Sequence, residues 1–211
     1  MRALVAILLF LALPLPALAG DLVVELKTAA GQPVTNAVVS FRPAAGAAAP
    51  IPARISAPLK VEQSNIHFDP FILLAPVGSE VSFPNRDKVR HHVYSFSPAK
   101  RFELKLYGRD ETRKVTFDKA GVVALGCNIH DQMMGFIVVL DTPYAAKVGA
   151  SGDVTLRDLP MGGGVVTVWQ PFLRGRDNQV VRQIVIPAQG AARVSLTLDL
   201  REPPAGKAPL L

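Results

Sequence analysis

The segment around the single cysteine carries the residues of this chain best suited to chemistry. Residues 127–135 read Cys-Asn-Ile-His-Asp-Gln-Met-Met-Gly, so a thiol, an imidazole and a thioether fall within seven positions at Cys127, His130 and Met133. One thiolate and two imidazoles with a weak, distant thioether suit a copper ion that changes between two oxidation states. Zinc is the alternative, because it accepts the same sulfur and nitrogen donors. The sequence therefore predicts a metal site that needs one further histidine.

Two adjacent histidines, His91 and His92, can supply the missing ligand. They begin a strand-like run that ends at Phe96 and follows a turn-rich loop starting at Asn85. Neighbouring residues of a strand point to opposite faces of the sheet. We therefore expect one histidine to face the metal and the other to face away from it or to support the site indirectly.

Two other interpretations of Cys127 compete with metal binding. A lone cysteine is typical of a buried, unreactive thiol, because free cysteine packs as a small hydrophobic residue. A cysteine and a histidine can also form a nucleophile and its base. Here Cys127 and His130 share one short loop with a thioether, and no third residue is placed to orient the base. This arrangement favours a metal site, and we do not predict an enzyme.

The start of the chain has the pattern of an export signal. Met1 and Arg2 precede an apolar run to about Leu15, and residues 17–19 form an Ala-Leu-Ala cleavage motif. The run is shorter than the roughly 20 residues that span a bilayer, and no later segment is long enough. The pattern predicts a secretory signal peptide over residues 1–19, a periplasmic or secreted protein, and no integral membrane segment after cleavage.

The charge of the chain does not indicate a nucleic-acid partner. The formal net charge is +6, but the Lys and Arg residues are scattered instead of forming one basic stripe. An acidic protein partner remains open. Only one cysteine is present, so an exported chain would leave its thiol without an internal disulfide partner and open to oxidation unless the thiol is buried or bound.

Apolar runs of strand length recur along the chain and predict an all-β fold of sandwiches. No stretch keeps a helical period for three turns. The runs cover residues 22–26, 37–41, 71–74, 80–83, 92–96, 114–117, 122–125, 136–140, 165–169, 183–186 and 193–198. Gly162–Gly164 lacks the Lys-Ser or Lys-Thr pair of a phosphate loop and is interpreted as a flexible turn. Trp169 and Phe172 are expected in a core or an interface.

Composition divides the chain. Residues 44–57 are mostly Ala and Pro, and residues 201–211 are similar, which predicts a linker and a loose tail. The predicted parts are a signal peptide (1–19), first strands of a flanking sandwich with the linker (20–57), a metal domain (58–141), the remainder of the flanking sandwich (142–200) and the tail (201–211). The two flanking segments are short for independent sandwiches, so we expect them to pair with each other.

The middle region, about residues 58–141, resembles the plastocyanin and amicyanin group of cupredoxins. The stretches that carry the resemblance are residues 65–70, 77–85, the His-His-Val of 91–93, the Ala-Gly of 120–121 and Cys-x-x-His-x-x-Met from Cys127. The sequence after Met133 continues as Met-Gly-Phe-Ile-Val-Val, most similar to amicyanin. The resemblance implies a cupredoxin-like Greek-key β-sandwich.

The resemblance also implies the site and its activity. One mononuclear type 1 copper would be bound by His91, Cys127 and His130, with Met133 as the axial ligand and Met134 as the alternative, and would transfer single electrons. His67 matches no ligand position and is interpreted as a surface or packing residue. The sequence identifies neither the redox partner nor the oligomeric state. Copper delivery or storage, or an interaction protein with a degenerate site, are the alternative functions.

Two positions depart from the cupredoxin pattern. His92 stands where the family usually has an asparagine that ties the ligand loops together, and Asn128-Ile129 replaces Thr-Pro. The tuning of the metal is therefore open. The flanking segments contain Gly-Gln-Pro-Val-x-x-Ala-Val-Val at residues 31–39 and Gly-Asp-Val-x-Leu-x-x-Leu-Pro-x-Gly at residues 152–162. Through these motifs, residues 22–43 and 144–200 resemble a carboxypeptidase-regulatory or transthyretin-like sandwich. Chains with this architecture often carry the label of methylamine utilisation proteins.

Overall fold

The computed structural model describes residues 19–44 and 58–204. The predicted signal peptide, apart from Ala19, lies outside the described residues, as do most of the predicted linker and the end of the predicted tail. Within the described ranges, no helix is long and apolar enough to cross a membrane. The predicted all-β fold class is confirmed, since the described chain consists of strands, loops and one short 3₁₀ turn, η1 (Arg176–Asn178).

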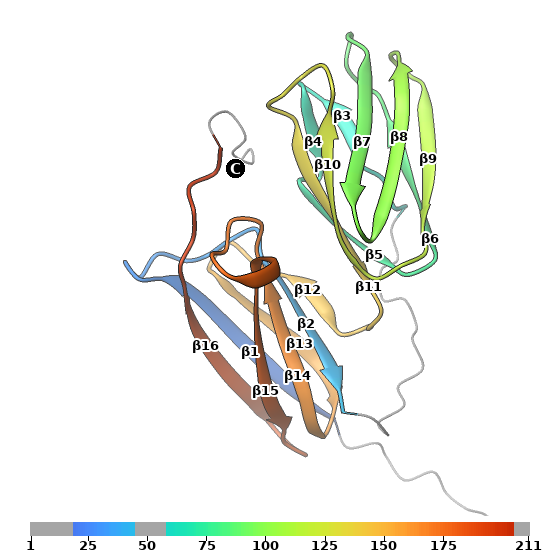
Figure 1. Cartoon of the computed structure of the whole chain (residues 1–211). Helices are drawn as coiled ribbons and strands as arrows, with labels where there is room; N and C mark the ends of the chain where they lie inside the picture. The colour runs from blue at the N-terminus through green and yellow to red at the C-terminus, as the bar shows by residue number, and fades with distance from the viewer. Residues whose placement is uncertain (1–18, 45–57, 205–211) are drawn as a thin grey trace, which may run out of the picture.

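One sandwich combines strands from both ends of the chain (Figure 1). Its first sheet has the order β13-β1-β16 and its second the order β12-β2-β14-β15. The bounds are β1 (Ala19–Thr28), β2 (Val38–Pro43), β12 (Ala145–Lys147), β13 (Asp153–Pro160), β14 (Gly162–Trp169), β15 (Gln179–Ile186) and β16 (Ala191–Leu198). Buried and less buried residues alternate along β1, and the inward-facing Leu22, Val24 and Leu26 have no exposed surface. This alternation lets each sheet bury one face against the other.

A second sandwich is formed by the strands between β2 and β12. Its main sheet has the order β5-β11-β10-β7-β8, and β3, β4, β6 and β9 form the opposite layer. The bounds are β3 (Glu62–Ser64), β4 (His67–Asp69), β5 (Ile72–Pro76), β6 (Ser79–Pro84), β7 (His91–Ser97), β8 (Lys100–Tyr107), β9 (Thr112–Phe117), β10 (Gly121–Cys127) and β11 (Met134–Leu140). Bridges from Lys60 to Ser82 and from Gln63 to Asn85 link the β3–β4 hairpin to β6. Cys127 and Met133 belong to the core between the layers.

The two sandwiches share a small apolar core. Trp169 at the end of β14 is 6% exposed and packs with residues of β5 and β11. Its ring centroid lies 5.3 Å from that of Phe136, which in turn lies 5.5 Å from Phe71, both edge to face. Trp169 is therefore an interface aromatic, and we expect the two sandwiches to unfold together.

The glycine triplet is not the flexible turn that the sequence suggests. Gly162, Gly163 and Gly164 belong to β14 and pair in register with Ile186, Val185 and Ile184 of β15. The physical reason is packing: the ring of Phe41 lies directly against Gly164, where a Cβ atom would collide with it. The absence of a side chain at Gly164 makes room for a core aromatic residue.

Candidate metal centre

Two neighbouring strands bring the predicted ligands together. His91 is the first residue of β7 and Cys127 the last residue of β10, and the register pairs Cys127 with Val93. The backbone N–H of Asn128 donates to the carbonyl of His92 at 3.1 Å, which ties the loop after Cys127 to the start of β7. Within that loop, the N–H of Met133 donates to the carbonyl of His130 at 3.0 Å.

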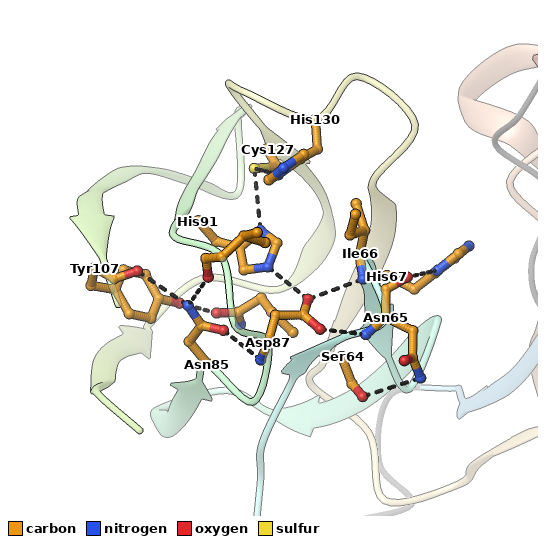
Figure 2. Close-up of polar contacts among 12 residues, drawn as sticks. Ser64, Asn65, Ile66, His67, Asn85, Asp87, His91, Tyr107, Cys127 and His130 are labelled. Carbon is orange, nitrogen blue, oxygen red and sulfur yellow. Dashed lines mark hydrogen bonds and ion pairs between the residues drawn. The ribbon is translucent and has the colours of Figure 1, made fainter. Parts of the chain in front are cut away.

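Three of the predicted ligands converge on one point (Figure 2). Sγ of Cys127 lies 3.7 Å from Nδ1 of His91 and 3.6 Å from Nδ1 of His130, and the three donor atoms lie within 4.8 Å of one another. Metal bonds to nitrogen and sulfur of about 2.0 and 2.3 Å place two ligands of one ion roughly 3.5–3.7 Å apart. The spacing and the chemistry of these donors therefore fit a single ion.

The site is buried on one side and reaches the surface on the other. His91 has no exposed surface and Cys127 is 3% exposed, whereas His130 is only partly buried and its neighbour Ile129 is 48% exposed. A buried thiolate and a partly exposed imidazole give a centre that is shielded from water but connected to the surface through His130.

The surroundings of Cys127 favour the thiolate, the form that binds metals. Burial alone would raise the pKa of Cys127, but hydrogen bonding by His91, by the backbone at His92 and Ile129, and by His130 outweighs it and lowers the pKa from 9.0 to about 6. For His91, burial alone would lower the pKa, and the interactions with Cys127 and Asp87 reverse that effect and raise it. The contacts of Cys127 thus favour the form of sulfur that a metal ion would bind.

The two candidate thioethers differ in their exposure. Met133 is 2% exposed and packs in the same core as Cys127, while Met134, the first residue of β11, is partly buried. Both line a surface cavity of about 400 Å³ that Cys127 and Phe136 also border. The axial role of Met133 stays a prediction that this placement supports.

His92 and His67 lie apart from the convergent donors. Along β7, His91 faces the core, whereas the ring of His92 faces the other way and pairs at 2.8 Å with the carboxylate of Glu103 on β8. The side chain of His92 therefore does not tie the ligand loops together, a connection that its backbone carbonyl makes instead. His67 is partly buried, with Nδ1 2.8 Å from the carbonyl oxygen of Asn65.

The pattern of soft donors does not predict the polar residues behind His91. Nε2 of His91 lies 2.8 Å from Oδ2 of Asp87. Fully buried Asn85 donates through its amide to the carbonyls of Val89 (2.9 Å) and Tyr107 (3.2 Å). A metal-bound histidine usually gives its other N–H to a carboxylate or carbonyl. The acidic residue four positions before His91 is therefore the sequence signal that indicates Asp87.

Comparison with known proteins yields structural matches only. No protein-family model and no curated protein matches this chain. A purple cupredoxin from Nitrosopumilus maritimus is 21% identical over 39% of this chain and 99% of its own, with a TM-score of 0.36. An amicyanin variant in its Cu(I) form is 22% identical over 50% and 99% of the two chains, with a TM-score of 0.37.

A copper-containing nitrite reductase from Thermus scotoductus also matches in part. It is 28% identical over 56% of this chain but only 28% of its own length, with a TM-score of 0.38. TM-scores this low do not assign a function, which has to come from the side chains of the site.

Proposed function

We propose that this chain binds one mononuclear type 1 copper ion and acts as a one-electron carrier without being an enzyme. His91, Cys127 and His130 are the strong ligands and Met133 is the axial one. The observation that carries the proposal is the convergence of one cysteine sulfur and two Nδ1 atoms within 4.8 Å. One thiolate and two imidazoles with a weak thioether form the ligand set of electron-transfer copper sites.

Copper bound there would supply a one-electron change between Cu(I) and Cu(II). The protein contributes rigidity, because His91 and Cys127 stand at the ends of paired strands and the loop of His130 is tied to β7. Ligands held in one arrangement for both oxidation states require little reorganisation when an electron moves. Partly exposed His130, beside exposed Ile129, is the proposed point of electron exchange with a partner.

The choice of axial ligand has a direct test. The axial group tunes the potential of such sites, so Met133→Leu should raise the reduction potential of the copper form, whereas Met134→Leu should leave it nearly unchanged. Because the two variants carry the same substitution, a difference between their reduction potentials reports which of the two side chains is the axial ligand. A larger shift in the Met134 variant would assign the axial role to Met134.

Copper delivery or storage is the second candidate function, because the same donors can hold copper without exchanging electrons. Protein-film voltammetry together with chelator competition separates the two functions. A carrier gives a reversible one-electron wave and retains its ion, whereas a delivery protein releases copper readily to the chelator. A protein that shows neither behaviour would be an interaction module with a degenerate site, and zinc held in preference to copper would contradict the carrier function.

We also propose that the protein acts in the periplasm or is secreted. The charged start, apolar run and Ala-Leu-Ala motif of residues 1–19 support this proposal. N-terminal sequencing of the protein recovered from the periplasm of a bacterial host should begin at Gly20, and recovery of the uncleaved chain in the cytoplasm would contradict it.

A further inference from the structure

When the ring of His91 is neutral, metal binding requires its single proton to be on one particular nitrogen. The side chain has no exposed surface, and each ring nitrogen has a close neighbour: Nδ1 lies 3.7 Å from Sγ of Cys127, and Nε2 lies 2.8 Å from Oδ2 of Asp87. A neutral imidazole carries one proton, which either nitrogen can hold. Metal binding needs the proton on Nε2, because the lone pair of Nδ1 must be free for the ion.

The carboxylate of Asp87 decides where that proton goes. Oδ2 of Asp87, which also accepts the backbone N–H of Ile66, lies 2.8 Å from Nε2 of His91, whereas Sγ of Cys127 lies 3.7 Å from Nδ1. A carboxylate oxygen accepts hydrogen bonds. The shorter contact therefore assigns the proton of His91 to Nε2, the nitrogen that faces Asp87.

Asp87 is itself held by a turn that is distant in sequence (Figure 2). Its Oδ1 accepts the backbone N–H of Asn65 at 2.6 Å, and its Oδ2 accepts that of Ile66 at 3.0 Å. These two residues form the whole loop of the β3–β4 hairpin, in which Ser64 pairs with His67. Two successive N–H groups thus converge on one carboxylate.

The conformation of this turn is unusual for its sequence. Asn65 and Ile66 have φ values of 53° and 59°, as a two-residue hairpin turn with the twist of the strands requires. Asparagine tolerates this left-handed region, whereas a β-branched residue rarely adopts it. Backbone conformations of this kind persist where their surroundings fix them, and the carboxylate of Asp87 supplies that constraint for Ile66.

Asn85 holds the backbone of Asp87. The side-chain oxygen of Asn85 accepts the backbone N–H of Asp87 at 2.8 Å, and the side-chain NH₂ of Asn85 donates to the carbonyls of Val89 and Tyr107. Asn85 has no exposed surface. The loop that leads into His91 is therefore held from within as well as by the hairpin.

We propose that Asp87 is a positioning residue that keeps the proton of His91 on Nε2 and leaves Nδ1 free for the metal. The turn at Asn65 and Ile66 holds Asp87 in place through its two backbone hydrogen bonds. The value of this arrangement for metal binding rests on the function proposed above. The position of the proton and the hydrogen bonds that hold Asp87 are properties of the metal-free protein, and both can be measured without copper.

The test uses the full chain with ¹⁵N-labelled histidine and backbone amides, in alkaline buffer where the ring is neutral. Long-range ¹H–¹⁵N correlation spectra should show the proton of His91 on Nε2, and the amides of Asn65 and Ile66 should resist hydrogen exchange. Asp87→Asn presents one oxygen and one NH₂ group to three donors, so it should mix the two tautomers of His91 and speed exchange at both amides.

A matched control is available at Asp110, whose side chain is 71% exposed and faces Arg86 and Arg109 instead of His91. Asp110→Asn makes the same change of charge and should leave both NMR signatures intact. With zinc ion alone as the probe, Asp87→Asn should bind about 10–100-fold more weakly, and Asp110→Asn should bind like the wild type.

Two results would overturn the proposal: a proton of His91 on Nδ1 in the wild type, or amides of Asn65 and Ile66 that exchange freely there. Both are read from the wild-type protein, so they do not depend on whether Asp87→Asn folds. If both signatures are present but cupric ion produces no thiolate band, the electron-transfer function fails and the positioning role of Asp87 stands.

Discussion

Cys127 of the metal-free protein should be a thiolate at neutral pH. Its pKa is lowered from 9.0 to about 6, because the hydrogen bonds of His91, the neighbouring backbone and His130 outweigh the effect of burial. A decrease of this size in the pKa corresponds to an acid dissociation constant that is about a thousandfold larger. At pH 7 about nine molecules in ten would then carry the thiolate, compared with about one in a hundred for an unperturbed thiol.

Ultraviolet absorbance of the thiolate measures this directly, with Cys127→Ser as the baseline. As the pH falls, the absorbance should persist through neutrality and disappear through a midpoint near 6. His91→Leu removes the largest favourable contribution and should move the midpoint upward, whereas His92→Leu keeps the backbone contribution of that residue and should not. A wild-type midpoint near 9 would refute the reasoning.

Three further predictions concern stability. Trp169→Ala should lower the free energy of unfolding by about 3–5 kcal/mol, because it leaves a cavity beside Phe136 in the shared core; denaturant unfolding that shows a loss below about 1 kcal/mol would contradict close packing of the sandwiches. Gly164→Ala should cost about 1–3 kcal/mol by overpacking against Phe41, while Gly163→Ala, whose Cβ would meet nothing within 4 Å, should cost clearly less in the same assay. Cupric ion should raise the Tm of the metal-free protein, since an ion that binds only the folded state stabilises it, and an unchanged Tm in calorimetry would count against a built site.

The convergence of His91, Cys127 and His130 could be predicted because most of the information is local. Cys127 and His130 are three positions apart in the sequence, and the run of alternating residues after His91 indicates that a strand presents it to one face. Pairing of β7 with β10 then brings the two parts together. The all-β class follows from the same short apolar runs.

The support for His91 could not be predicted in the same way. The contacts of Asp87 join residues 21 and 22 positions apart through a hairpin turn, and its Asn-Ile sequence lacks the glycine typical of such turns. Strand β8 is also absent from the apolar pattern, because it is an edge strand whose outward positions are mostly charged. The three glycines of β14 suggest a turn in the sequence, because the packing of Gly164 against the ring of Phe41 joins residues that are far apart along the chain.

The absorption spectrum of the mature protein after addition of cupric ion tests the central claim most directly. A type 1 site predicts an intense thiolate-to-copper band in the red part of the visible spectrum at one ion per chain, and loss of that band in Cys127→Ser. Absence of the band from a folded wild-type protein, or its persistence in Cys127→Ser, would contradict a copper centre built on Cys127.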